Sequence, residues 1–159
     1  MSNYLFFALM YKDREILNNV LNELKNNFGN IVSKSPEYDF NFTDYYEDEF
    51  GSNLKKIIIV FDDKIDKDDL SKIKILCSQI EMEHSSWNKR KINIDPGYLN
   101  SGEVVLASFK GKDFKEDIGQ GVYAHKVLEF NNGQIKDFFH TFPDFKSSTV
   151  KDFFKGIIK

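Results

Sequence analysis

Five consecutive apolar residues, Ile57-Ile58-Ile59-Val60-Phe61, form the most strand-like stretch of this 159-residue sequence. A continuous run of this kind is typical of a strand that is covered on both faces. The run Leu5–Met10 has the same character. Both runs therefore predict buried central strands, and we expect them to belong to a mixed sheet.

Each of these two runs is followed by a segment with helical periodicity. Arg14–Phe28 is preceded by Asp13, whose carboxylate can accept the free N–H groups of a first turn, and is followed by Gly29, which can adopt a positive φ. Asp69–Met82 carries its apolar residues at helical spacing. We expect a last helix from about Ser148, because apolar residues again recur there at that spacing.

The rest of the chain is predicted to be strands and loops. Asp44–Gly51 is acidic and aromatic, and we interpret it as a loop. Lys91–Asp95 alternates between polar and apolar residues, and Pro96-Gly97 is expected to end that strand. Val104–Phe109 is a further strand, and a charged loop is expected to follow it at 110–120.

A β-hairpin is predicted near the C-terminus. Asn132-Gly133 separates two strand-like segments, and Asn-Gly suits a type I′ turn, which needs positive φ at both central residues. The order of elements predicts an α+β fold: a ferredoxin-like split β-α-β core with an added β-hairpin and a C-terminal helix. The length fits a single domain over residues 1–159.

Composition narrows the class of protein. Lysine and arginine number 22 against 25 acidic residues, and the pI is about 5.6, so a DNA-binding role is disfavoured. Cys77 is alone, which excludes an intrachain disulfide, and its apolar neighbours indicate a buried, inert thiol. The chain has no apolar stretch of membrane-spanning length and its N-terminus does not look like a signal peptide, so we expect a cytoplasmic protein.

Familiar catalytic motifs are absent from the sequence, including phosphate-binding glycine loops, H-E-x-x-H and G-x-S-x-G. Asn93 and Asp95 share the polar face of their predicted strand, where Asp95 could act as a base or bind a cation. The alternative is an Asx-Pro turn that only ends the strand.

Two other groups of residues have a chemical and a structural interpretation. Asp44 and Glu47 belong to an acidic segment that could hold a cation or could be a solvated loop. Two of the histidines His84, His125 and His140, together with a carboxylate, could bind a transition metal, but their spacing is equally that of ordinary surface or half-buried residues.

Five short strings spread along the chain occur in the order and at the spacing of a known family. They are Phe42-Thr43-Asp44-Tyr45-Tyr46, Asn93-Ile94-Asp95-Pro96-Gly97-Tyr98-Leu99, Val104-Val105-Leu106-Ala107-Ser108, Gly121-Val122-Tyr123-Ala124 and Thr141-Phe142-Pro143-Asp144-Phe145. Through them the chain resembles bacterial and archaeal proteins catalogued as domain of unknown function 4416. That family has no assigned activity, so the resemblance implies one folded domain and a shared pocket rather than a reaction.

The resemblance also implies two departures. Phe114 and Lys115 stand where the family usually carries a His-Arg pair, and His125 stands where it usually carries Glu. If that His, Arg and Glu form an active site, this member has an altered one.

Two functions fit these observations. The first is an enzyme or ligand-binding domain whose carboxylates and tyrosines converge on one polar cleft for a small molecule, such as a phosphorylated one. Its candidate catalytic residues are Asp95, Asp44 and Glu47, and its candidate ligand-binding residues are Tyr98, Arg90, Lys110, Tyr123 and His125. Arg90 and Lys110 would counter an anionic group. The second function is a non-catalytic module that binds protein or RNA through exposed aromatic residues. The sequence indicates no particular cofactor or metal.

Overall fold

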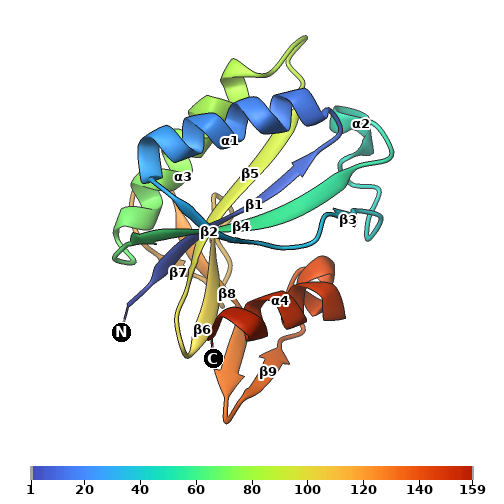
Figure 1. Cartoon of the computed structure of the whole chain (residues 1–159). Coiled ribbons are helices and arrows are strands. Elements are labelled where there is room, and N and C mark those ends of the chain that lie inside the picture. Colours follow the sequence, from blue (N-terminus) through green and yellow to red (C-terminus); the bar gives the residue numbers. More distant parts are fainter. Residues whose placement is uncertain (1, 159) are drawn as a thin grey trace.

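A computed structural model describes residues 2–158 and contains one nine-stranded sheet with helices on both of its faces (Figure 1). The strands are β1 (Tyr4–Tyr11), β2 (Ile31–Lys34), β3 (Tyr38–Asp39), β4 (Lys55–Lys64), β5 (Ile92–Leu99), β6 (Glu103–Ser108), β7 (Glu116–Asp117), β8 (Tyr123–Asn131) and β9 (Gln134–Asp137). The helices are α1 (Arg14–Phe28), α2 (Glu47–Phe50), α3 (Asp69–Glu83), the 3-10 helix η1 (Pro143–Lys146) and α4 (Ser148–Ile158). The fold is α+β, as predicted.

The strands run in the order β2-β4-β1-β5-β6-β8-β7, with β3 paired to β4 and β9 paired to β8. Every strand pairing in the described part of the chain is antiparallel, so the prediction of a mixed sheet is wrong. Continuous apolar strands are common in parallel sheets because helices cover both faces. Here helices cover both faces of an antiparallel sheet, and the central strands have the same composition for the same reason.

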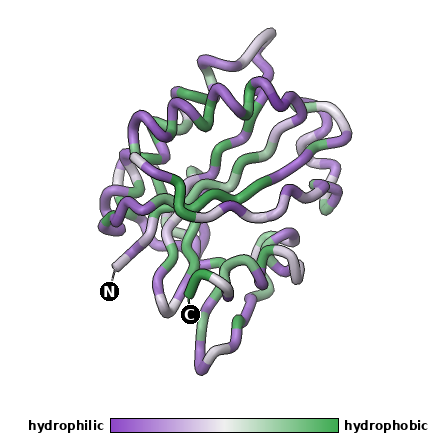
Figure 2. Tube along the Cα trace, viewed as in Figure 1, coloured by the Kyte–Doolittle hydropathy of each residue, from purple (hydrophilic) through white to green (hydrophobic). Residues whose placement is uncertain are grey.

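The two faces of the sheet hold separate hydrophobic cores. On one face, α1 and α3 pack on alternate residues of β1 and β5, among them Leu5, Phe7 and Ile94. On the other face, η1 and α4 pack on the intervening residues, such as Phe6 and Ala8. The tube in Figure 2 is accordingly most hydrophobic along the central strands.

The predicted helix boundaries near the N-terminus are confirmed. The Asp13 carboxylate accepts a hydrogen bond from the N–H of Glu15 at 2.9 Å, and Gly29 ends α1 with φ of 94°. Cys77 on α3 is fully buried, and burial raises the pKa of its thiol well above its usual value. In residues 2–158, none of the helices combines the length and hydrophobicity needed to cross a bilayer.

The predicted C-terminal hairpin is also confirmed. Asn131 pairs with Gln134, and Asn132 and Gly133 between them have φ of 52° and 77°, as a type I′ turn requires. Two predicted loops contain short elements instead. The acidic segment forms α2, which places three carboxylates in a first helical turn, where the helix dipole favours them. The charged loop includes β7.

The strand β5 does not stop at Pro96-Gly97, contrary to the prediction. It continues to Leu99, because β1 pairs with it along its whole length and β6 pairs with it from Gly97 onward. The N–H of Ile94 points away from β1, since it is bonded to Glu81 on α3, and the nitrogen of Pro96 faces the same way by alternation. A missing N–H on that side breaks no ladder bond.

Candidate functional site

Asp95 lies on the face of β5 opposite to Ile92 and Ile94. Its cross-strand neighbour Ala8 belongs to the core beneath α4, whereas Ile92 and Ile94 pack beneath α1 and α3. The Asp95 side chain is 24% exposed. The predicted polar orientation of Asp95 is therefore correct, and its position in a continuous strand removes the alternative in which it only begins a turn.

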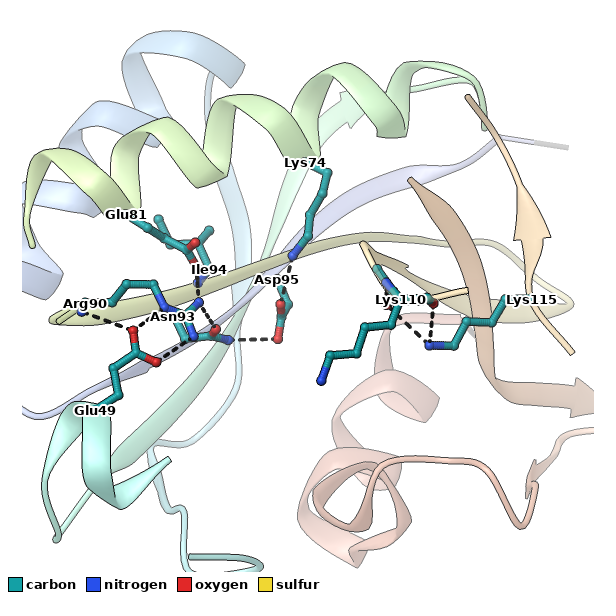
Figure 3. Close-up of polar contacts among 10 residues, drawn as sticks. Glu49, Lys74, Glu81, Arg90, Asn93, Ile94, Asp95, Lys110 and Lys115 are labelled. Atoms are coloured by element: carbon teal, nitrogen blue, oxygen red, sulfur yellow. Dashed lines mark hydrogen bonds and ion pairs between the residues drawn. The ribbon is translucent and has the colours of Figure 1, made fainter. Parts of the chain in front are cut away.

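Positive charges surround the Asp95 carboxylate. Lys74 reaches it from α3 at 3.2 Å, and the Asn93 amide donates to its other oxygen at 2.9 Å (Figure 3). Burial alone would raise the pKa of Asp95, but the charges of Lys74 and Lys56 and the bond from Asn93 outweigh it, so the pKa is lowered. Asp95 is thus an ionised, partly accessible carboxylate at neutral pH.

Arg90 is bound by carboxylates of the chain itself. Its Nε donates to Glu49 at 2.7 Å and its Nη2 to the other Glu49 oxygen at 2.9 Å, while Nη1 donates to Asn93 at 2.9 Å (Figure 3). Glu81 accepts the N–H of Ile94 at 2.7 Å, and burial raises the pKa of this carboxyl. These contacts tie α2 and α3 to the start of β5. Arg90 therefore positions Asn93, which in turn holds Asp95.

A group of lysines lies in the loop after β6. Lys110 donates to the Tyr45 hydroxyl at 3.4 Å, and in Figure 3 its side chain extends toward the space beside Asp95. Lys115 donates to Ser108 at 3.3 Å, and burial, followed by the charges of Lys110 and Lys112, lowers its pKa. Among the ion pairs of the described residues, none involves these three lysines. Their positive charge is left uncompensated at short range.

The acidic segment contributes Glu49, through Arg90, and its tyrosines to this region, but not the predicted carboxylates Asp44 and Glu47. Asp44 and Glu47 are exposed, and in the described residues neither side chain makes a hydrogen bond or an ion pair. Tyr45 and Tyr46 pack edge to face, with ring centroids 5.0 Å apart. Burial and then the charge of Asp95 raise the pKa of Tyr46 to about 12. The negative charge of Asp95 therefore acts on the Tyr46 hydroxyl of this segment.

His125 and Tyr123 lie on the same face of the sheet as Asp95, two strands away. His125 pairs with Leu106, which packs beneath α4, and Gly111 lies against the Tyr123 ring. His125 is 2% exposed, and its ring centroid lies 5.4 Å from that of Phe114. The positions at which the chain departs from the family it resembles are thus in contact with each other.

Tyr98 lies apart from the other predicted residues. It packs beneath α1 and α3, and its hydroxyl donates to Glu103 at 3.1 Å. It lines a pocket of about 180 Å³, together with Phe114 and Lys126. The structure therefore separates Tyr98 from Asp95 by the thickness of the sheet.

Two buried lysines near Asp95 were not predicted. Lys74 lies in the middle of the apolar stripe of α3, four residues after Leu70 and three before Cys77, and that spacing was an available signal. Lys56 precedes the apolar run of β4 and forms a buried ion pair with Asp144 at 2.8 Å. A contact between residues so far apart in the sequence leaves no trace in local pattern.

Comparison with known protein families confirms the family that the sequence resembles. The family described as Domain of unknown function (DUF4416) matches residues 1–159, and the chain belongs to it. Neither the comparison with curated proteins nor that with solved structures gives a match.

Proposed function

We propose that the surface around Asp95 binds a small anionic molecule, phosphorylated molecules included, and that Asp95 acts on it as a general base or holds a cation that accompanies it. One observation carries the proposal: Lys74 contacts both the ionised, partly accessible Asp95 carboxylate and Phe109, which directly precedes a loop whose Lys110 and Lys115 form no ion pair in the described residues.

The lysines support an anionic ligand. Lys110 and Lys115 come from one loop. Each ammonium group already donates a hydrogen bond within the protein, which restricts how it can move. Uncompensated ammonium groups bind phosphate or carboxylate oxygens through charge-assisted hydrogen bonds. Burial, and then the charges of Lys110 and Lys112, lower the pKa of Lys115, and a bound anion would offset both effects.

Asp95 supports a reaction or a cation at the same place. A carboxylate in a strand interior that is surrounded by lysine ammonium groups costs desolvation energy that an apolar residue would avoid. Lys74 holds it from one side, and the Lys74 ammonium also lies 5.2 Å from the centre of the Phe109 ring. Phe109 immediately precedes Lys110, so the carboxylate and the lysine loop are joined through Lys74. This arrangement suits a base or a cation ligand beside a bound anion.

The test is a thermal-shift screen of the untagged protein against nucleotides, sugar phosphates and inorganic phosphate, with and without Mg²⁺. A ligand present at 100 times its Kd stabilises the native state by about 2.7 kcal/mol, which corresponds to about 5–10 °C in Tm for a chain of this size. We expect Lys110→Gln to reduce the affinity for the best ligand at least about tenfold, and Asp95→Asn to change it by a similar factor, downward where Mg²⁺ bridges the carboxylate and the anion.

Lys34→Gln is the matched control. This exposed lysine lies on β2, which β4 and β1 separate from the strand β5 that carries Asp95. It should leave the affinity unchanged. The proposal is wrong if no compound shifts the Tm, or if Asp95→Asn lowers stability while leaving the ligand affinity intact.

A second candidate, a non-catalytic module that binds protein or RNA, is favoured by two aromatic side chains. Trp87 is 94% exposed and Phe139 is 89% exposed, and both lie in turns rather than on the sheet. An interaction through them would be lost in Trp87→Ala or Phe139→Ala, and neither variant should alter binding of a small anion beside Asp95.

We further propose that β1, β2, β4 and β5 with α1 and α3 form a ferredoxin-like split β-α-β core. The support is the order β2-β4-β1-β5, with α1 following β1 and α3 connecting β4 to β5. The Asp95 region would then lie on the face of this core that α1 and α3 leave to the C-terminal elements.

A further inference from the structure

Glu23, Glu83 and His84 bring three metal-ligating side chains together on the helical side of the molecule. Glu23 lies in the second half of α1, Glu83 is the last residue of α3, and His84 caps that helix. One ligand atom from each lies within 4.8 Å of the other two. The group belongs to neither the Asp95 surface nor the lysine loop.

Two atoms of this group are buried and have no partner but each other. Glu23 Oε2 and His84 Nε2 are shielded from solvent and make no hydrogen bond to the described residues. Buried polar atoms are almost always paired, because an unpaired one costs about 1–3 kcal/mol. Two such atoms, close to each other but without a hydrogen bond, are the arrangement expected of two ligands of one ion.

The distance between these two atoms suits a shared metal ion better than a hydrogen bond. His84 Nε2 and Glu23 Oε2 are 3.5 Å apart. An N–H···O hydrogen bond usually spans about 2.7–3.2 Å. Tetrahedral Zn²⁺, with bonds of about 2.0–2.2 Å to nitrogen and oxygen, places two of its ligand atoms roughly 3.4 Å apart. The observed separation matches that of two ligands on one ion.

We infer that Glu23, Glu83 and His84 form a Zn²⁺ site with three protein ligands and a fourth position for water. The imidazole favours a transition metal over Ca²⁺ or Mg²⁺, which prefer oxygen ligands alone. Glu83 is exposed and can turn toward the ion. The bound ion joins α1 to the end of α3, two helices that are otherwise linked through the sheet and the hydrophobic core, and so stabilises the native state.

The experiment is a calorimetric titration of ZnCl2 into untagged, EDTA-treated and dialysed protein. We expect one Zn²⁺ per chain, a higher Tm in its presence, and an affinity at least about tenfold lower in both His84→Gln and Glu23→Gln. Glu15→Gln is the control, because Glu15 is an exposed carboxylate on the same helix. It should bind Zn²⁺ as the unmodified chain does.

The Co²⁺ derivative distinguishes this site from others. Tetrahedral nitrogen and oxygen ligands give visible d–d bands without the near-ultraviolet band of a thiolate. A thiolate band would place the metal at Cys77 and overturn the inference. Absence of saturable Zn²⁺ binding, or unchanged binding in both His84→Gln and Glu23→Gln, would do the same, and Glu23 and His84 would then be a simple ion pair.

Discussion

His125 is a buried imidazole whose surroundings oppose its protonation. Its ring lies 5.0 Å from that of Phe142 and 5.2 Å from that of His140, centroid to centroid, and neither of its nitrogens has a partner in the described residues. Burial, then the charge of Lys115, then His140 lower its pKa to about 4. The folded protein therefore holds this side chain neutral at pH values at which the unfolded chain protonates it.

The first prediction concerns the pH dependence that follows from His125. Between an unfolded pKa of about 6.5 and a folded pKa of about 4, the unfolded chain binds more protons, so the free energy of unfolding falls as the pH is lowered through this range. We expect His125 to account for about 1–3 kcal/mol of that fall. Urea unfolding at pH 7 and at pH 4.5 measures it, and His125→Leu should show a smaller difference between the two. Equal differences in both proteins would mean that His125 is protonated in the native state.

Alternation along β5 explains which site residues could be predicted. Asn93 and Asp95 alternate with Ile92 and Ile94, so their polar side was visible in the sequence. The same alternation assigns Tyr98 to the side of the isoleucines, but only if the strand continues past Pro96-Gly97. The shared family string Asn93–Leu99 predicts Tyr98 in the same cleft as Asp95, but the structure places it on the other face.

Among the elements, β5 depends on a single glycine where β6 joins it. A Cβ atom on Gly97 would lie 2.3 Å from the carbonyl oxygen of Val105 and 2.6 Å from the Phe6 ring. Real Cβ atoms do not approach backbone atoms so closely, and Val105 is held in the sheet by its pairs on both sides. Gly97 thus allows β5 and β6 to pack closely and does not form a turn. A Pro-Gly pair in the sequence does not distinguish these two roles, so the prediction of a strand end is wrong here.

The second prediction is that Gly97→Ala destabilises the protein. The added methyl group must displace β6 or Phe6, and overpacking of this kind costs about 1–3 kcal/mol, with the upper end expected because one neighbour is backbone. Gly156→Ala is the matched control. Gly156 lies in α4 with no atom within 4 Å of the added Cβ, so alanine should raise stability by about 0.5–1 kcal/mol. Chemical unfolding of both variants measures the contrast, and similar effects of the two would refute the role assigned to Gly97.

At the scale of the whole chain, the C-terminal layer is attached to the sheet by a polar contact within an apolar core. Asp144 of η1 accepts a hydrogen bond from the Tyr38 hydroxyl at 2.8 Å and pairs with Lys56 of β4 at the same distance. Phe145 beside it is fully buried against α4. Local patterns predicted the longer strands and helices, but they could not predict that this segment carries the counter-ion of a buried lysine. That pairing joins residues 88 positions apart, 56 to 144, and depends on the folded chain alone.

The last prediction tests whether this ion pair holds the two layers together. The Lys56 and Asp144 side chains are 8% and 2% exposed, so removing one charge leaves the other buried and unpaired. Lys56→Met should therefore cost about 3–5 kcal/mol. Adding Asp144→Asn removes the stranded charge and keeps an acceptor for the Tyr38 hydroxyl, so the double variant should recover at least about half of that loss. Lys67→Met breaks the exposed pair with Glu116 and should change stability by no more than about 0.5 kcal/mol. Urea midpoints at constant m-value measure all three. If Lys56→Met costs no more than Lys67→Met, the Phe145 and α4 contacts alone attach the C-terminal layer, and the lysine is dispensable for the fold.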